Sequence, residues 1–197
     1  MSKIAFDIAI LPPENIQDIC VELCNKYANN SGQLRLNKID NLTHISLFMG
    51  MTEKNDLPDM FERVEKITNN LGTLKLELET LKKINNTHFF VVKKTPELQN
   101  LHEKIVNELK DYKAKNTTAD MFFDEKIDES TFFWTDNYIT GSSFQKFWPH
   151  ITLKGCAKPK YDDLPKKFIA DKIAICHLGD HCTCRKILWE TNLKPNT

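Results

Sequence analysis

Two four-residue segments of this chain share one pattern: His44-Ile45-Ser46-Leu47 and His150-Ile151-Thr152-Leu153. In both segments polar and apolar residues alternate, which is the period of a half-buried β-strand. Because side chains two residues apart on a strand point to the same side, each segment presents an imidazole beside a hydroxyl. The chain is therefore expected to contain two strands that bury their Ile and Leu side chains and present a His–hydroxyl pair on the other face.

The elements around the two motifs are expected to repeat as well. Apolar residues recur every three or four positions where helices are predicted, and every second position, or in short runs, where strands are predicted. The order strand, helix, motif strand, helix, strand is predicted to occur twice, as a duplication of topology. The predicted elements are strands at 4–11, 43–49, 73–81, 87–93, 148–154, 171–177 and 185–192 and helices at 14–29, 57–70, 96–113 and 161–168.

Residues 114–147 do not fit this duplicated order. The stretch is too aromatic for a disordered linker, and long connections in compact proteins are usually functional. We predict a packed flap beside the site, with a hairpin that only covers a sheet as an equally weighted alternative. Its aromatic residues are Phe122, Phe123, Phe132, Phe133, Trp134, Tyr138 and Phe144.

Charge and composition narrow the function classes. The chain has 197 residues, with 27 Lys and Arg against 27 Asp and Glu, so a broad polyanion-binding surface is not expected. A short phosphate ligand in a local positive pocket is compatible with this balance. Asp7 interrupts the first apolar run, so no signal peptide is predicted. We expect no membrane span, reduced thiols and a cytoplasmic location, with the nucleus as the alternative.

The paired motifs suit phosphodiester chemistry. If the two strands face one cavity, two imidazoles and two hydroxyls surround a bound phosphate. A neutral His can take a proton from an attacking water while a protonated His donates one to the departing oxygen. The ordinary imidazole pKa of about 6.5 lets both forms exist near neutral pH, and hydroxyl groups can stabilise charge on the phosphate oxygens. The motifs therefore predict a phosphoesterase that needs no metal.

The two motifs, with Pro149 before His150, resemble those of the 2H phosphoesterase superfamily, which includes 2′-5′ RNA ligase-like proteins and cyclic phosphodiesterases. The resemblance implies an α+β fold over 1–197: a bilobal, pseudo-twofold symmetric domain with two antiparallel sheets around a central cleft. It implies a monomer without cofactor that hydrolyses 2′,3′-cyclic phosphates or 2′-5′ linkages in nucleotides or short RNA. His44, Ser46, His150 and Thr152 would be catalytic, with His150 as base and His44 as acid.

Three further residues are candidates for substrate binding. Phe48 follows Ser46 by two positions and Trp148 precedes His150 by two, so each would share a face with its motif and could stack on a base. A core role is equally weighted for both. Lys154 stands near the place where some relatives carry Arg and would supply a cation. The alternatives to an enzyme are a nucleotide- or RNA-end-binding module without turnover and a structural protein with vestigial motifs.

Other chemically suggestive residues are expected to be structural. The residues of 176–184 include two His and three Cys, but their spacing does not match a standard zinc site, so a β-hairpin without metal is predicted. Cys20 and Cys24 lie one helical turn apart and are expected in the core. His88 is predicted to have a surface or packing role, and His102 is predicted to be solvated.

Overall fold

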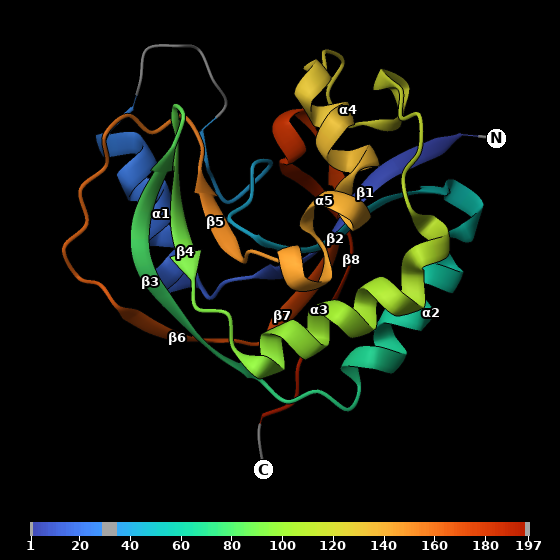
Figure 1. The fold of residues 1–197 in the computed structure, drawn as a ribbon, viewed down its shortest axis with the longest axis horizontal. Coiled ribbons are helices and arrows are strands. Elements are labelled where there is room, and N and C mark those ends of the chain that lie inside the picture. Colours follow the sequence, from blue (N-terminus) through green and yellow to red (C-terminus); the bar gives the residue numbers. More distant parts are fainter. Residues whose placement is uncertain (1, 29–34, 196–197) are drawn as a thin grey trace.

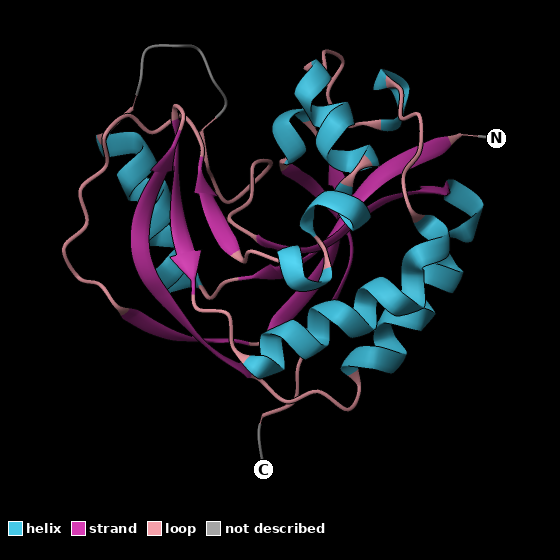
Figure 2. Cartoon of the chain, viewed as in Figure 1, coloured by secondary structure: helices cyan, strands magenta, loops and turns pink. Residues whose placement is uncertain are grey.

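The computed structural model describes residues 2–28 and 35–195 (Figure 1). The fold is α+β with two four-stranded antiparallel sheets, as predicted (Figure 2). The apolar core is continuous between them and includes Phe6 from the first sheet and Phe90 from the second. Across the described residues no helix combines the length and the apolar character that crossing a bilayer requires.

The first sheet has the strand order β2-β1-β7-β8. Strand β1 (Lys3–Leu11) is central and buried along nearly its whole length, which explains its almost continuous apolar sequence. Strand β2 (Ile45–Glu53), which begins at the second residue of the first motif, is an edge strand beside β1. Strands β7 (Lys172–Leu178) and β8 (Cys184–Asn192) form a hairpin on the other side of β1, as the C-terminal pattern predicts.

The second sheet has the order β5-β4-β3-β6. Its strands are β3 (Leu74–Ile84), β4 (Thr87–Val92), β5 (His150–Leu153) and β6 (Lys166–Ala170). The second motif forms β5, again an edge strand beside the strand that precedes it in the duplicated order. Both motifs therefore occupy equivalent places, one at the edge of each sheet.

Helices α1 and α3 each pack against the sheet of the other unit. Helix α1 (Glu14–Lys26) follows β1 but contacts β5 of the second sheet, whereas α3 (Pro96–Leu109) follows β4 but contacts β2 of the first (Figure 1). Helix α2 (Leu57–Thr68) packs beside α3 and against β8. This exchange ties the two β-α-β units into one core, and Cys20 and Cys24 lie buried in it as free thiols.

The second unit is less complete than the first. The helix predicted at 161–168 is wrong, because residues 157–165 form turns and loop and β6 begins at Lys166. Pro165, in the middle of the predicted helix, lacks the N–H group that a helix interior needs. In β6, buried Phe168 and Ala170 alternate with exposed neighbours, which is the period of a strand.

The stretch 114–147 is helical and packs on the first sheet. It contains α4 (Glu129–Asp136), α5 (Tyr138–Ser142) and two single 3₁₀ turns, Ala119–Met121 and Phe144–Lys146. Both α-helices contact β2, the first motif strand. All of 114–147 is described and no strand occurs in it, so the hairpin alternative is wrong.

His102 connects this stretch to the motif strand. Its side chain is 0% exposed, so the prediction that it is solvated is wrong. The Nδ1–H donates to the carbonyl oxygen of Leu47 at 2.8 Å, Nε2 accepts from the N–H of Phe144 at 3.0 Å, and the ring stacks on Phe147. Of the charged residues next to it in α3, Lys104 is exposed, whereas Glu103 is partly buried and acts electrostatically on the His102 ring. His88 is also buried, with Nδ1 3.2 Å from the carbonyl oxygen of Cys156, a packing role.

Candidate active site

The two motifs line one cavity of about 530 Å³ between the sheets and α4–α5. His44 and Ser46 reach it from the first sheet, and His150 and Thr152 from the second. The stretch 114–147 contributes Ser130, Trp134, Tyr138, Gly141, Ser142, Lys146 and Phe147. This stretch therefore lies beside the site and forms part of its wall.

The two motif histidines make the same backbone hydrogen bond. The Nδ1–H of His44 donates to the carbonyl oxygen of Leu42, and the Nδ1–H of His150 donates to that of Trp148, each at 2.8 Å. A carbonyl oxygen can only accept, so Nδ1 must carry the proton in both rings. When either ring is neutral, its lone pair is therefore on Nε2, the nitrogen that is left for chemistry.

Burial makes charge costly on both rings. It lowers the pKa of His150 to about 4, and the nearby His44 adds to this effect. Burial also lowers the pKa of His44. In the ligand-free site both imidazoles consequently favour the neutral form at neutral pH. A phosphate anion in the cavity would favour charge on the ring that lies nearer to it, because an opposite charge stabilises an imidazolium.

Aromatic rings hold His150 in place. The ring of Trp148 stacks on it with centroids 4.4 Å apart, and Phe89 meets it edge-on at 5.0 Å. Lys82 lies over the ring of Trp148, with Nζ 5.5 Å from the centroid. Trp148 lines the cavity together with His150, but its ring already contacts His150, Phe89 and Lys82. Its clearest role in the structure is to orient the imidazole.

Phe48 does not lie where the sequence predicts. It is 0% exposed and packs edge-on against Phe6 and Tyr138. Ser46 pairs with Ala9 and Phe48 pairs with Ile8, so the strand carries an extra residue, Leu47, between them. Such a bulge breaks the alternation of faces. The prediction that Phe48 shares the Ser46 face is wrong, and Met49 lines the cavity instead.

Lys154 lies at the cavity wall, where it can supply positive charge to a bound phosphate. Burial lowers the pKa of its ammonium group, while Asp180, Cys182 and Asp128 act in the opposite direction. The side chain is thus a partly buried cation with acidic neighbours on one side. The sequence pattern placed it near the second motif, and the structure brings it to the same cavity.

Asp7 lies beside the first motif and is a residue that the sequence patterns do not indicate. Its carboxyl is fully buried behind the first motif, where Oδ2 accepts the Ser46 hydroxyl at 2.6 Å and lies 3.8 Å from Nε2 of His44. The thiol of Cys184 donates to the same oxygen at 3.9 Å. Burial raises the pKa of Asp7 well above its ordinary value. An Asp inside the apolar run of β1 was the available signal, but its partners come from distant segments.

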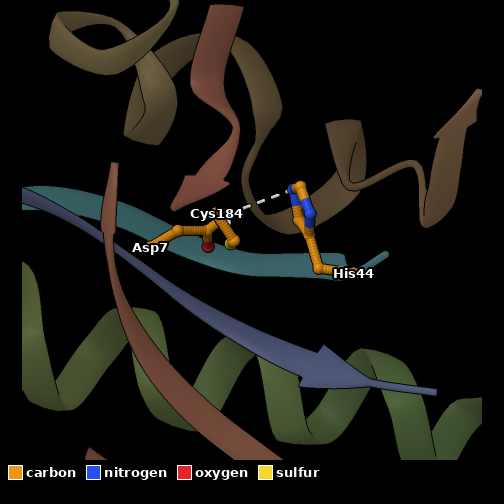
Figure 3. Close-up of side chains that lie close together, drawn as sticks. All are labelled: Asp7, His44 and Cys184. Atoms are coloured by element: carbon orange, nitrogen blue, oxygen red, sulfur yellow. Dashed lines mark hydrogen bonds and ion pairs between the residues drawn. The ribbon is translucent and has the colours of Figure 1, made fainter. Parts of the chain in front are cut away.

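Asp7, His44 and Cys184 also form a set of donor types that zinc binds (Figure 3). Their ligand atoms lie within 4.8 Å of one another. Oδ2 of Asp7 is 3.8 Å from Nε2 of His44 and 3.9 Å from Sγ of Cys184. In a tetrahedral zinc site, bond lengths of about 2.0–2.3 Å place neighbouring ligand atoms about 3.3–3.6 Å apart, closer than they are here. Oδ2 of Asp7 also already accepts a hydrogen bond from Ser46. The trio is a polar cluster in which Cys184 donates to Asp7, and its side chains would have to close further to hold an ion.

The Cys and His residues of 176–184 lie in different surroundings and do not form one cluster. Cys176 is buried in the sheet, and His177 lies 3.0 Å from the carbonyl oxygen of Met121. His181 and Cys182 lie at the cavity wall, while Cys184 contacts Asp7. Within 2–28 and 35–195, the trio with Asp7 and His44 is the one group of three potential metal ligands that comes this close.

Comparison with solved structures supports the fold. A structure of TT0787 from Thermus thermophilus matches with a TM-score of 0.64 at 13% identity, covering 98% of this chain and 100% of that one. E. coli LigT complexed with phosphate matches at 0.59 and 12% identity, covering 98% and 99%. A structure described as a phosphoesterase matches at 0.59 and 11%, covering 96% and 98%. Other matching LigT structures hold 3′-AMP and ATP.

At the level of sequence, no family model and no curated protein matches this chain. The structural likeness extends over nearly the whole length of the chains compared, at identities that establish fold alone. Both the two-sheet architecture and the duplicated β-α-β units agree with it. The chain therefore has the LigT-like α+β fold, which is also that of the structure described as a phosphoesterase.

Proposed function

We propose that the protein is a phosphoesterase that hydrolyses a 2′,3′-cyclic phosphate or a 2′-5′ phosphodiester bond in a nucleotide or short RNA. One observation carries the proposal. His44 and His150 are held by identical Nδ1 hydrogen bonds, and both rings, each with a hydroxyl two residues away, line the same cavity. Two imidazoles with matched tautomers are what a paired acid and base require.

In the proposed reaction, Nε2 of neutral His150 takes a proton from a water molecule as the water oxygen bonds to phosphorus. The bond from phosphorus to the leaving ribose oxygen breaks, and Nε2–H of protonated His44 gives that oxygen its proton. Thr152, Ser46 and Lys154 stabilise the charge on the non-bridging oxygens. The product is a phosphomonoester and a free hydroxyl. The two histidines then regain their starting forms by exchange with solvent, and no step requires a metal.

The shape of the site suits a nucleotide. A volume of about 530 Å³ lies within the usual range of small-molecule sites, about 300–1,000 Å³. The wall combines aromatic side chains, which can stack on a base, with Lys146 and Lys154, which can meet phosphate. LigT, which shares the fold, has been crystallised with phosphate, 3′-AMP and ATP. A nucleotide-sized phosphate ligand therefore agrees with both the cavity and the fold.

The test is a substrate panel of 2′,3′-cyclic nucleoside monophosphates, 2′-5′ oligoadenylates and RNA with a cyclic phosphate end, with the product resolved as 2′- or 3′-phosphate. His44→Ala and His150→Ala should each lose turnover by about 100-fold or more while still binding nucleotide. His177→Ala, a matched change at a histidine outside the cavity, should keep wild-type rates. Activity should persist in EDTA.

The substrate panel also distinguishes an enzyme from a nucleotide-binding module without turnover. A nucleotide-binding module would bind members of the panel without turning any over, and that result would overturn the proposal. Activity lost in EDTA and restored by zinc would overturn the metal-free mechanism while leaving a phosphoesterase.

A further inference from the structure

The strand beside each motif carries a different polar residue at one equivalent position. Ser46 pairs with Ala9 of β1, and Thr152 pairs with Phe89 of β4. Two residues earlier on these strands, β1 carries Asp7 and β4 carries Thr87. The first unit therefore has a carboxyl group behind its hydroxyl where the second has only another hydroxyl. This ionisable group is one departure from the pseudo-twofold symmetry of the site.

Asp7 is fully buried, and its polar atoms are only partly satisfied. Oδ2 accepts from Ser46 at 2.6 Å and from the thiol of Cys184 at 3.9 Å. Oδ1 is buried with no hydrogen-bond partner among the residues that the structure describes. An ionised carboxylate in such a place is costly unless an opposite charge lies close by. Either Asp7 is protonated, or a cation must balance it.

The groups around Asp7 and His44 show which cation is available. Tyr138 faces Asp7 from α5, and Cys182 and Cys184 face it from the C-terminal segment. Burial raises the pKa of all three, that of Cys182 to about 12, so these groups are neutral near pH 7. His150 faces His44 from β5 and disfavours a second positive charge there. Among these neighbours only His44, with Nε2 3.8 Å away, can carry a balancing charge.

We propose that Asp7 is a positioning residue that shares a single proton with His44 and so assigns the acid role to His44 and the base role to His150. This inference rests on the proposed phosphoesterase function. The contact at 3.8 Å is too long for a hydrogen bond, so the coupling in the ligand-free site is electrostatic. The pair is neutral as carboxylic acid with imidazole, or zwitterionic as carboxylate with imidazolium.

Substrate binding decides between these two forms. In the empty cavity burial favours the uncharged form, because it raises the pKa of Asp7 and lowers that of His44. A phosphate anion beside Nε2 favours the imidazolium, so the proton moves to the nitrogen that faces the leaving oxygen. His150 has no carboxyl partner at the matching position and stays neutral, as a base must. In the ligand-free site Ser46 donates to Asp7 and is held there in one orientation.

The test in the enzyme is the pH dependence of kcat/KM in Asp7→Asn. The amide fills the same space and can still bond Ser46, but it cannot hold the shared proton. The alkaline limb of the profile should move to lower pH by about 1–3 units, because His44 then keeps its proton alone. Cys184→Ala, which removes the other contact of Asp7, should leave the limb in place. A uniform loss of rate with an unmoved limb would overturn the inference.

A second measurement needs neither the variant nor turnover. In the wild-type protein, NMR of the Asp7 carboxyl carbon should show a midpoint above the ordinary Asp value of about 3.9, and the His44 ring signals should respond at the same pH. Titration of Asp7 in its ordinary range, or a His44 ring that does not respond, would overturn the shared proton. If wild type turns over no substrate, the proposed function fails, and this titration still decides whether the pair exists.

Discussion

The Nδ1–H of His102 donates a 2.8 Å hydrogen bond to the carbonyl oxygen of Leu47. Leu47 is the extra residue of the β2 bulge, between Ser46 in the cavity wall and Phe48 in the core. Nε2 of the same ring accepts from the N–H of Phe144, which lies near the end of the stretch 114–147 that forms part of the cavity wall. One buried imidazole thus holds both the bulge that sets the faces of the motif strand and the end of the helical insertion.

His102→Ala is expected to destabilise the protein by roughly 2–4 kcal/mol. The change leaves the Leu47 carbonyl and the Phe144 N–H without their partner and opens a cavity beside Phe147. The free energy of unfolding is measured by urea titration. Turnover should fall too, because the bulge places Ser46. His177→Ala is the control, and equal stability in the two variants would contradict this account.

Stability should fall as the pH is lowered from about 6.5 towards 4. Burial lowers the pKa of His102 to about 4, so between these values the unfolded chain binds a proton that the folded protein excludes. A shift from about 6.5 to 4 corresponds to roughly 3 kcal/mol for this residue. His102→Gln can donate to Leu47 and accept from Phe144 without titrating.

The His102→Gln variant should therefore lose less stability than the wild-type protein over the same pH range. Urea titrations at pH 8, 6 and 4.5 compare it with wild type. Parallel losses in the two proteins would show that His102 is not the group responsible. His150, whose pKa burial also lowers to about 4, is expected to account for part of the remaining loss in both.

Phe48→Ala and Trp134→Ala should have opposite consequences. Phe48 is 0% exposed, so its truncation should cost roughly 3–5 kcal/mol of stability. Trp134 is 53% exposed and lines the cavity, so its truncation should change stability by less than about 1 kcal/mol. The Trp134 variant should instead bind nucleotides more weakly. Urea titration and nucleotide-binding calorimetry on both variants test the contrast, and a stable Phe48→Ala protein would show that the bulge is misplaced.

Lys154→Gln should weaken the binding of phosphate ligands by about 10-fold and reduce its dependence on salt. The substitution removes a partly buried cation at the cavity wall while keeping a similar side-chain length. Binding of inorganic phosphate and of 3′-AMP at two ionic strengths measures both effects. Lys160→Gln, a change at an exposed lysine outside the cavity lining, is the matched control. Equal affinities in the two variants would remove Lys154 from the binding site.

Much of the fold follows from local patterns in the sequence. The alternation at both motifs predicts two half-buried strands, and the structure has β5 at the second and β2 continuing from the first. The spacing of apolar residues likewise predicts α1, α2 and α3, although α1 ends at Lys26 and residue 29 lies outside the described part of the chain. Side-chain periodicity is local, since it depends only on how an element turns. The antiparallel two-sheet arrangement came from the resemblance that the motifs carry.

Tertiary structure alone decided which side chains meet. The bulge at Leu47 turns Phe48 away from the cavity, and its cause lies in pairing with β1 rather than in the β2 sequence. His102 is buried because the insertion covers α3, which no pattern within α3 reveals. Asp7 lies thirty-nine positions from Ser46 in the chain, so only sheet pairing brings the two together. Periodicity fixes the faces of single elements, whereas register, bulges and the choice of covering element depend on contacts between distant segments.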